Sequence, residues 1–203
     1  MNIRTNKGIE DTILNLFEEL SYKHHWRNNE YCKNIHYYNG WKTNQSYFIN
    51  KKVIIPLNAF DRYDSAFNPR YDVRRKLEDI QKCLTYLDKG IASEVDIENQ
   101  LNFAEECGDT KDIQLKYFKV DFFKKGTTHI TFTDSDILKR FNIFAGRSKN
   151  WLPPSYGKKA YKDMTNEEKN IINEFEGQQE YNKVISNPKY YIIQNTELLQ
   201  IAN

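Results

Sequence analysis

The sequence predicts an α+β domain, with a small, mainly antiparallel sheet built from hairpins and covered by four or five helices. Apolar and polar residues alternate on both sides of Lys125-Gly126, which predicts a hairpin over residues 113–132. Asn39-Gly40 favours a type I′ turn and predicts a second hairpin over residues 31–49. A helical repeat of apolar residues over 73–87 predicts the first covering helix.

The N-terminal part of the chain is predicted to contribute one helix and one strand. Helical spacing indicates an amphipathic helix over about residues 8–23, packed on the domain. Residues 51–57 predict a short buried strand, and Pro56 places it at a sheet edge or ends it, because proline donates no ladder hydrogen bond. Residues 58–71 have no periodicity and predict a loop.

Two consecutive helices should follow this loop. The first covers the apolar repeat over 73–87, and Gly90 can adopt the left-handed conformation that ends it. Ser93, with Asp96 three residues later, predicts the start of a second, acidic helix. That helix should run to about Cys107 and end at Gly108.

In the hairpin around Lys125-Gly126, the apolar residues shift from odd-numbered positions (113, 115 and 117) to even-numbered positions (118, 120 and 122). The change indicates a bulge near Tyr117-Phe118, or a strand buried on both faces. Beyond the turn, His129 and Thr131 should face one side of the strand, and Ile130 the other.

A helix should follow that hairpin, with Thr133 as its N-cap and Asp134 and Asp136 in its first turn, where they complement the helix dipole. Gly146 should end it. Its predicted buried face consists of Ile137, Leu138, Phe141 and Phe144.

The C-terminal part is predicted to begin with an exposed linker over residues 155–162. Thr165 and Glu168 form a capping box that should start a further helix. Residues 189–194 could form a last strand, and the tail after Asn195 should be weakly ordered.

At 203 residues, the chain is long enough for one domain, or a domain with a small appendage. We divide it into an N-terminal helix packed on the domain (1–30), a core α+β domain (31–155), and a C-terminal helix and tail (156–203). A hydrophobic content of 39% and a mean hydropathy of −0.82 indicate a modest core. Twelve Phe, 14 Tyr and 3 Trp argue against disorder, which is poor in aromatics.

The sequence predicts a cytoplasmic protein. No apolar run approaches the roughly 18 residues that cross a bilayer, and the N-terminus lacks a signal-peptide core. Cys32, Cys83 and Cys107 are odd in number and far apart, so we expect reduced thiols and neither a disulfide framework nor a zinc site.

Charge is distributed in blocks although the net charge is only +2. Residues 22–76 carry 11 basic and 4 acidic side chains, and residues 116–162 carry 11 and 3. Between them, residues 77–115 carry 3 and 10. The blocks could form a basic face, or they could pair with each other across the fold.

Cofactor and metal motifs are missing from the sequence. It has 8 Gly, no glycine-rich phosphate loop and no methyltransferase tetrad, since Asn187-Pro188-Lys189-Tyr190 has Lys where the second Pro belongs. We therefore expect no nucleotide cofactor. We also expect no metal, because no known metal spacing is found among His24, His25, His36, His129, Asp61, Asp64 and Asp72.

The second basic block mixes cations with aromatic residues, the two ingredients of nucleic-acid grooves. The predicted nucleic-acid contacts are Lys116, Lys119, Lys124, Lys125, Lys139, Arg140, Arg147, Lys149 and Trp151. His129 is the one candidate catalytic residue: as a nuclease base it could act beside Lys124 or Lys125. The alternative is a structural strand histidine, which the lack of a partner motif favours.

Three segments, 37–58, 76–90 and 116–142, resemble a bacterial and phage family of domains of unknown function, as does Trp151-Leu152-Pro153. Phe123, Gly126, His129, Phe132, Asp136, Leu138 and Asn142 match or nearly match its pattern. Lys125-Gly126-Thr127 departs from it, because the family usually has Asn-Gly-Asn. Members often lie at the end of, or beside, adenine-specific DNA methyltransferases, so the resemblance implies a setting of DNA modification or phage–host conflict.

These observations favour a non-catalytic, nucleic-acid-associated accessory domain of phage or mobile-element type. One alternative is a phage-encoded inhibitor that binds a bacterial defence protein, for which the acidic block over 77–115 would be the interface. A second alternative is a nuclease that uses His129. The expected partners are thus a nucleic acid or a bacterial host or phage protein, and no membrane; the oligomeric state stays open.

Overall fold

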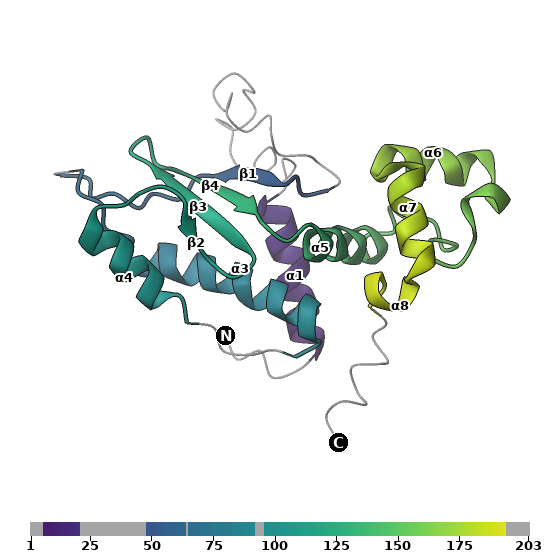
Figure 1. Ribbon diagram of the computed structural model, residues 1–203, viewed down its shortest axis with the longest axis horizontal. Helices are drawn as coiled ribbons and strands as arrows, with labels where there is room; N and C mark the ends of the chain where they lie inside the picture. The colour runs from purple at the N-terminus through teal and green to yellow at the C-terminus, as the bar shows by residue number, and fades with distance from the viewer. Residues whose placement is uncertain (1–5, 21–47, 64, 92–95, 194–203) are drawn as a thin grey trace. The chain divides into compact units, whose positions relative to one another are not determined.

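The computed structural model describes residues 6–20, 48–63, 65–91 and 96–193 (Figure 1). Nearly all of the hairpin predicted over 31–49 lies outside these residues, as do Cys32 and three of the four histidines. The chain divides into two compact units, Met1–Leu138 and Lys139–Asn203. The three-part division made from the sequence stays a prediction.

The first unit contains a four-stranded antiparallel sheet, which confirms the α+β class. Its strand order is β1-β4-β3-β2, so β1 is an edge strand, as Pro56 indicated. The strands are β1 (Lys52–Ile55), β2 (Ile113–Gln114), β3 (Phe118–Phe123) and β4 (Thr127–Phe132).

Burial alternates along β3 and β4, so the sheet has one apolar face and one mixed face. Phe118, Val120, Phe122, Ile130 and Phe132 are at most 2% exposed and form the inner face. Helices α1 (Asn6–Leu20), α3 (Tyr71–Lys89) and α4 (Glu98–Cys107) lie along one side of the sheet in Figure 1. The apolar residues of α1 and α3 that the helical spacing identified are buried.

Helices α3 and α4 end as the sequence indicated. Gly90 and Gly108 have φ of 73° and 71°, and each donates its N–H to a carbonyl in the preceding turn. The start of α4 was predicted too early: the helix begins at Glu98, and the Asp96 carboxylate accepts the N–H of Glu98 at 2.8 Å. Asp96 therefore precedes the helix instead of lying in its first turn, and Ser93 is outside the described residues.

The shift in the apolar pattern at Tyr117-Phe118 coincides with a turn between strands β2 and β3. The predicted bulge, or strand buried on both faces, is wrong. Strand β2 ends at Gln114, and the Leu115 N–H donates to the Phe118 carbonyl at 2.8 Å. Tyr117 is buried in this turn, where its hydroxyl donates to Asp88 of α3 at 2.7 Å. An apolar side chain in a tight turn shifts the alternation in the same way as a bulge would.

Helix α5 (Ser135–Ser148) differs from its prediction at both ends. Asp134 takes the capping role assigned to Thr133, because its carboxylate accepts the N–H groups of Asp136 and Ile137 at 3.0 and 2.9 Å. Gly146 lies inside the helix, where a Cβ atom would come within 3.1 Å of the Leu152 side chain. Its small size permits close packing, which the sequence pattern does not distinguish from a helix end.

The second unit contains α6 (Asn166–Phe175), α7 (Gly177–Ser186), α8 (Pro188–Tyr191) and a 3₁₀ turn (Tyr161–Asp163). The capping box of Thr165 and Glu168 is confirmed. These helices, with the end of α5, enclose a separate core. It consists of Ile143, Leu152, Tyr156, Met164, Ile172, Tyr181, Val184, Tyr191 and Ile192.

Two predictions for the second unit are wrong. The segment 155–162 is not an exposed linker, because Tyr156 is 1% exposed and fills the core. The residues expected to form a strand over 189–194 begin instead with α8, which Pro188 starts at the first helical position. Across the described residues, no helix is both long and apolar enough to cross a membrane.

Candidate nucleic-acid interface

The outer face of the sheet carries the side chains that alternate with the buried core residues. Strand register places Ile54 of β1 opposite His129 of β4, and His129 opposite Asp121 of β3. The next positions on the same face are Lys52 and Lys119, both paired with Thr131. This confirms the side of β4 on which His129 and Thr131 were expected.

An aromatic pair lies at one end of this face. The rings of Phe123 and His129 are 4.1 Å apart between centroids, at 36° to each other. Phe123 is the last residue of β3, and Gly126, at φ 84°, closes the following turn by donating to the Phe123 carbonyl at 2.9 Å. The expected turn at Lys125-Gly126 is thus confirmed, and it fixes the position of the Phe123 ring.

Lysines surround the pair. Lys111 Nζ lies 2.9 Å from the centroid of the Phe123 ring, and Lys125 Nζ lies 5.8 Å from it. Lys52 is exposed on β1, and Lys124 is exposed in the turn between β3 and β4. Within the described residues, none of these four lysines has an ion-pair partner, whereas Lys119 is paired with Asp112.

His129 is held neutral by its surroundings. Its pKa is lowered to about 4, mainly by burial and also by the charges of Lys52, Lys125 and Lys111, which Asp121 partly opposes. Both ring nitrogens are buried and have no hydrogen-bond partner in the described part of the chain. A general base needs an accessible nitrogen, so this geometry does not favour the catalytic candidate.

We expect the imidazole of His129 to titrate near pH 4 in NMR spectra, below the ordinary value near 6.5. The neutral ring is favoured in the folded state, so the stabilisation is complete above about pH 6.5 and is lost as the pH falls toward 4. His129→Gln identifies the resonance, because the sequence has three other histidines. A midpoint for His129 at or above 6.5 would contradict the burial and charge described here.

The nine predicted nucleic-acid contacts are divided between the two units. Lys116, Lys119, Lys124 and Lys125 belong to the first unit, and the other five belong to the second. Lys116 is tied to the turn after β2, where its Nζ donates to the Tyr117 hydroxyl at 2.6 Å. Only Lys124 and Lys125 combine exposure with the vicinity of the aromatic pair.

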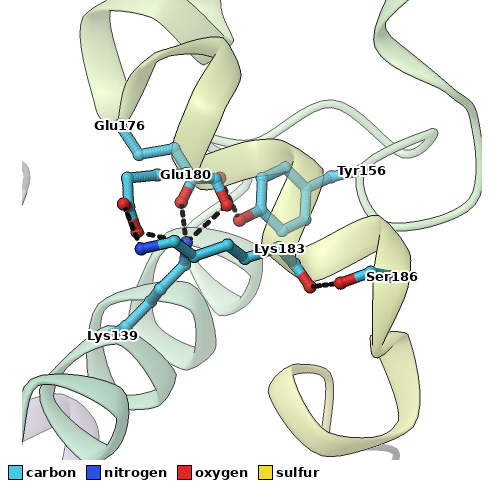
Figure 2. A network of polar contacts seen from close by, with 6 residues as sticks. All are labelled: Lys139, Tyr156, Glu176, Glu180, Lys183 and Ser186. Carbon is cyan, nitrogen blue, oxygen red and sulfur yellow. Dashed lines mark hydrogen bonds and ion pairs between the residues drawn. The ribbon is translucent and has the colours of Figure 1, made fainter.

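Lys139, one of the predicted nucleic-acid contacts, already has two carboxylate partners within the second unit. Its Nζ lies 3.0 Å from Glu176 Oε2 and 3.0 Å from Glu180 Oε2, and it donates to the Glu180 carbonyl at 2.6 Å (Figure 2). The Tyr156 hydroxyl donates to the other oxygen of Glu176 at 2.5 Å. The Lys139 side chain is 12% exposed, so we exclude it from the proposed interface.

Two other predicted contacts of the second unit lie over aromatic rings. The Arg140 guanidinium lies 4.6 Å from the Tyr190 ring, and Arg140 is only 9% exposed. Lys149 Nζ lies 5.6 Å from the ring of Trp151. Arg147 is half-buried in the last turn of α5.

Sequence reasoning missed Lys52, Lys111 and Phe123 as parts of the site. Lys52 lies in the first basic block and Lys111 in the acidic block, so block counting assigned them elsewhere. Strand alternation could have placed Phe123 on the His129 face, because both residues are odd-numbered members of a hairpin that closes at residues 124–126.

The other chemistry-bearing residues that the structure describes form no metal-binding cluster. Among the described residues, no group of three or more His, Cys, Asp or Glu side chains could hold a metal ion. Cys83 and Cys107 are free thiols, as expected; Cys83 is buried, and burial raises its pKa to about 12.

A family model described as "Domain of unknown function (DUF4942)" matches residues 2–151. The chain belongs to the DUF4942 family. The DUF4942 match contains the whole sheet and the Phe123–His129 pair, and it ends before α6. No curated protein and no solved structure matches the chain.

Proposed function

We propose that this DUF4942 protein is a non-catalytic, nucleic-acid-associated accessory domain, and that the outer face of its sheet is the binding surface. The observation that carries the proposal is the group of lysines around Phe123 and His129. Lys52, Lys111 and Lys125 act electrostatically on one imidazole, and within the described residues none of them is in an ion pair.

Lysines that are in no ion pair are suited to a ligand of high negative charge density. Bringing like charges together is unfavourable, so the cluster gains most from a ligand that neutralises several of them at once. A nucleic-acid backbone does this, because its phosphates are regularly spaced and release counterions when lysines replace them. Lys124, exposed in the turn after Phe123, extends the charged surface.

We also propose the biological context in which this domain binds nucleic acid. The resemblance to domains that lie beside adenine-specific DNA methyltransferases supports a role next to DNA modification, in a phage or a mobile element. Such a domain would hold nucleic acid while a separate protein performs the chemistry. This chain's own sequence has neither a phosphate loop nor a methyltransferase tetrad, which agrees with an accessory role.

Replacing Lys52, Lys111 and Lys125 together by alanine should weaken binding to labelled oligonucleotides roughly tenfold or more at low salt. The slope of log affinity against log salt should become shallower by about one for each phosphate that the variant no longer neutralises. Fluorescence anisotropy across a salt series, on single- and double-stranded DNA and on RNA, measures both quantities.

A matched control is the triple alanine variant of Lys89, Lys162 and Lys189, three exposed lysines on helix α3 and in the second unit that give the same change of net charge. It should retain most of the affinity and of the salt slope. No binding of any nucleic acid by the wild type at low salt, or equal losses in the two triple variants, would overturn the proposal.

A second candidate function, binding to a bacterial host or phage protein, is favoured by one exposed apolar side chain. Phe103 is 66% exposed on α4, and the exposed Glu106, three residues later on the same helix, adds negative charge. Aromatic residues are enriched in protein interfaces relative to the rest of the surface. Failure of the nucleic-acid experiment would make this surface the leading candidate.

A further inference from the structure

The environment of Phe123 indicates what kind of nucleic acid the site takes, an inference that rests on the proposed function. One neighbour of the ring is His129, whose plane lies at 36° to it with centroids 4.1 Å apart. Another is the ammonium group of Lys111, 2.9 Å from the ring centroid. The ring is therefore held by a neutral aromatic and covered by a cation on a long, exposed side chain.

We propose that the site binds single-stranded nucleic acid, with an unpaired base stacked on Phe123 in the place that Lys111 Nζ occupies. Aromatic side chains bind bases through their faces, and every base offers such a face. In a duplex both faces of an internal base are covered by its neighbours, so Phe123 can take only a base from a single strand or a frayed end.

Lys111 can leave the ring at little cost. Its Nζ is held there by a cation–π contact at an exposed site, and in the described residues it has no ion pair to lose. An entering strand brings a phosphate together with each base. Lys111 can therefore exchange the ring for a phosphate oxygen, a stronger partner for an ammonium group.

His129 keeps the stacking surface in place. Its ring is neutral at physiological pH, so it adds no charge that would compete with the lysines for the backbone. It is fixed in the centre of the sheet by the register with Ile54 and Asp121. A ring fixed before binding loses little conformational freedom when a base stacks on it, which favours affinity.

Base stacking of this kind tolerates any sequence and does not distinguish DNA from RNA by itself. The ligand class is thus a short single strand of either type, and free nucleotides share its chemistry. Oligothymidylate, oligouridylate and thymidine monophosphate are the probes that separate these sources. A strand should bind more tightly than the monophosphate, because Lys52, Lys124 and Lys125 contact phosphates beyond the stacked nucleotide.

Phe123→Leu should weaken binding of oligothymidylate about 5- to 100-fold, the range expected when one base no longer stacks. It should leave the weaker binding of a relaxed circular duplex, which has no ends, unchanged. Phe123→Tyr keeps an aromatic face and should retain the single-strand affinity. An oligonucleotide with one 2-aminopurine gives a direct signal, because moving that base from its neighbours in the strand onto Phe123 changes its fluorescence, and the leucine variant should reduce this change.

Phe103→Leu is the matched control, because Phe103 is an exposed phenylalanine elsewhere in the same unit. This variant should change neither the affinity for oligothymidylate nor the fluorescence signal of 2-aminopurine. The inference fails if Phe123→Leu and Phe103→Leu bind oligothymidylate equally, or if duplex and single strand bind alike. In those outcomes weaker binding by the triple lysine variant would still support the proposed function. Failure of the wild type to bind any nucleic acid would remove both.

Discussion

Replacing Lys139 by methionine should lower the local free energy of unfolding of the second unit by about 3–5 kcal/mol. Lys139 and Glu176 form an ion pair of 3.0 Å in which their side chains are 12% and 8% exposed. Methionine leaves the Glu176 carboxylate buried, with the Tyr156 hydroxyl as its one remaining hydrogen-bond donor among the residues that the structure describes. An unpaired buried charge is far more costly than the loss of an exposed pair. Amide hydrogen exchange of α6 and α7 measures the effect within the unit.

Glu180→Gln provides the control, because it removes the second carboxylate of the network at a side chain that is 42% exposed. We expect it to cost no more than about 1 kcal/mol. Glu176→Gln, added to Lys139→Met, should recover much of the loss because it removes the unpaired charge. Equal effects of Lys139→Met and Glu180→Gln would show that burial does not strengthen the Lys139–Glu176 pair.

The destabilisation by Lys139→Met should also depend on pH. Burial raises the pKa of Glu176, and the hydrogen bonds from Tyr156 and Lys139 oppose that rise. Without Lys139 the pKa rises further. A carboxyl group whose pKa is raised in the folded state costs more stability as the pH rises from its ordinary value of 4.5 to that folded value, and the cost is constant above it. The loss should therefore be smaller near pH 5 than near pH 7.5.

Phe122→Ala should cost about 3–5 kcal/mol of stability, whereas truncation of the adjacent Phe123 should cost nearer 1 kcal/mol. Phe122 is 1% exposed on the inner face of the sheet, and its ring centroid lies 5.4 Å from that of Phe67. Phe123 is half-buried on the outer face. One residue along a strand reverses the face, so two neighbouring phenylalanines have different energetic roles.

Urea unfolding followed by circular dichroism compares the two truncations, and oligothymidylate binding compares their functional effects. Phe122→Ala should unfold at lower urea concentration and, where still folded, bind normally. Phe123→Ala should stay folded and bind weakly. If both variants lost stability and binding in parallel, binding would report only the folding of the sheet.

Local patterns were sufficient for the hairpin and the helix ends, because each depends on a few consecutive residues. The alternation around Lys125-Gly126 correctly predicted the hairpin of β3 and β4, and Gly90 correctly predicted the end of α3. The errors arose where one residue type serves two purposes. The buried Tyr117 in a tight turn gives the same sequence pattern as a bulge. Gly146, which allows close packing with Leu152, gives the same sequence pattern as a helix end.

The candidate site was harder to predict because its members are distant in the sequence. Lys52 is brought beside His129 by the pairing of β1 with β4, which no local pattern specifies. The density of basic residues correctly drew attention to Lys124 and Lys125 but also included Lys139, whose charge is used within the second unit. Charge counting does not reveal which lysines already have carboxylate partners.

The ion pair of Lys139 crosses the end of the family match. Lys139 lies inside the matched span of 2–151, while Tyr156, Glu176 and Glu180 lie beyond it. A fragment that stopped at residue 151 would keep the ammonium group, lose both carboxylates and uncover Ile143. The end of the matched span therefore packs against residues that lie beyond it. A relative that lacked the later helices would need a polar, exposed residue in place of Ile143 and a different partner for the lysine.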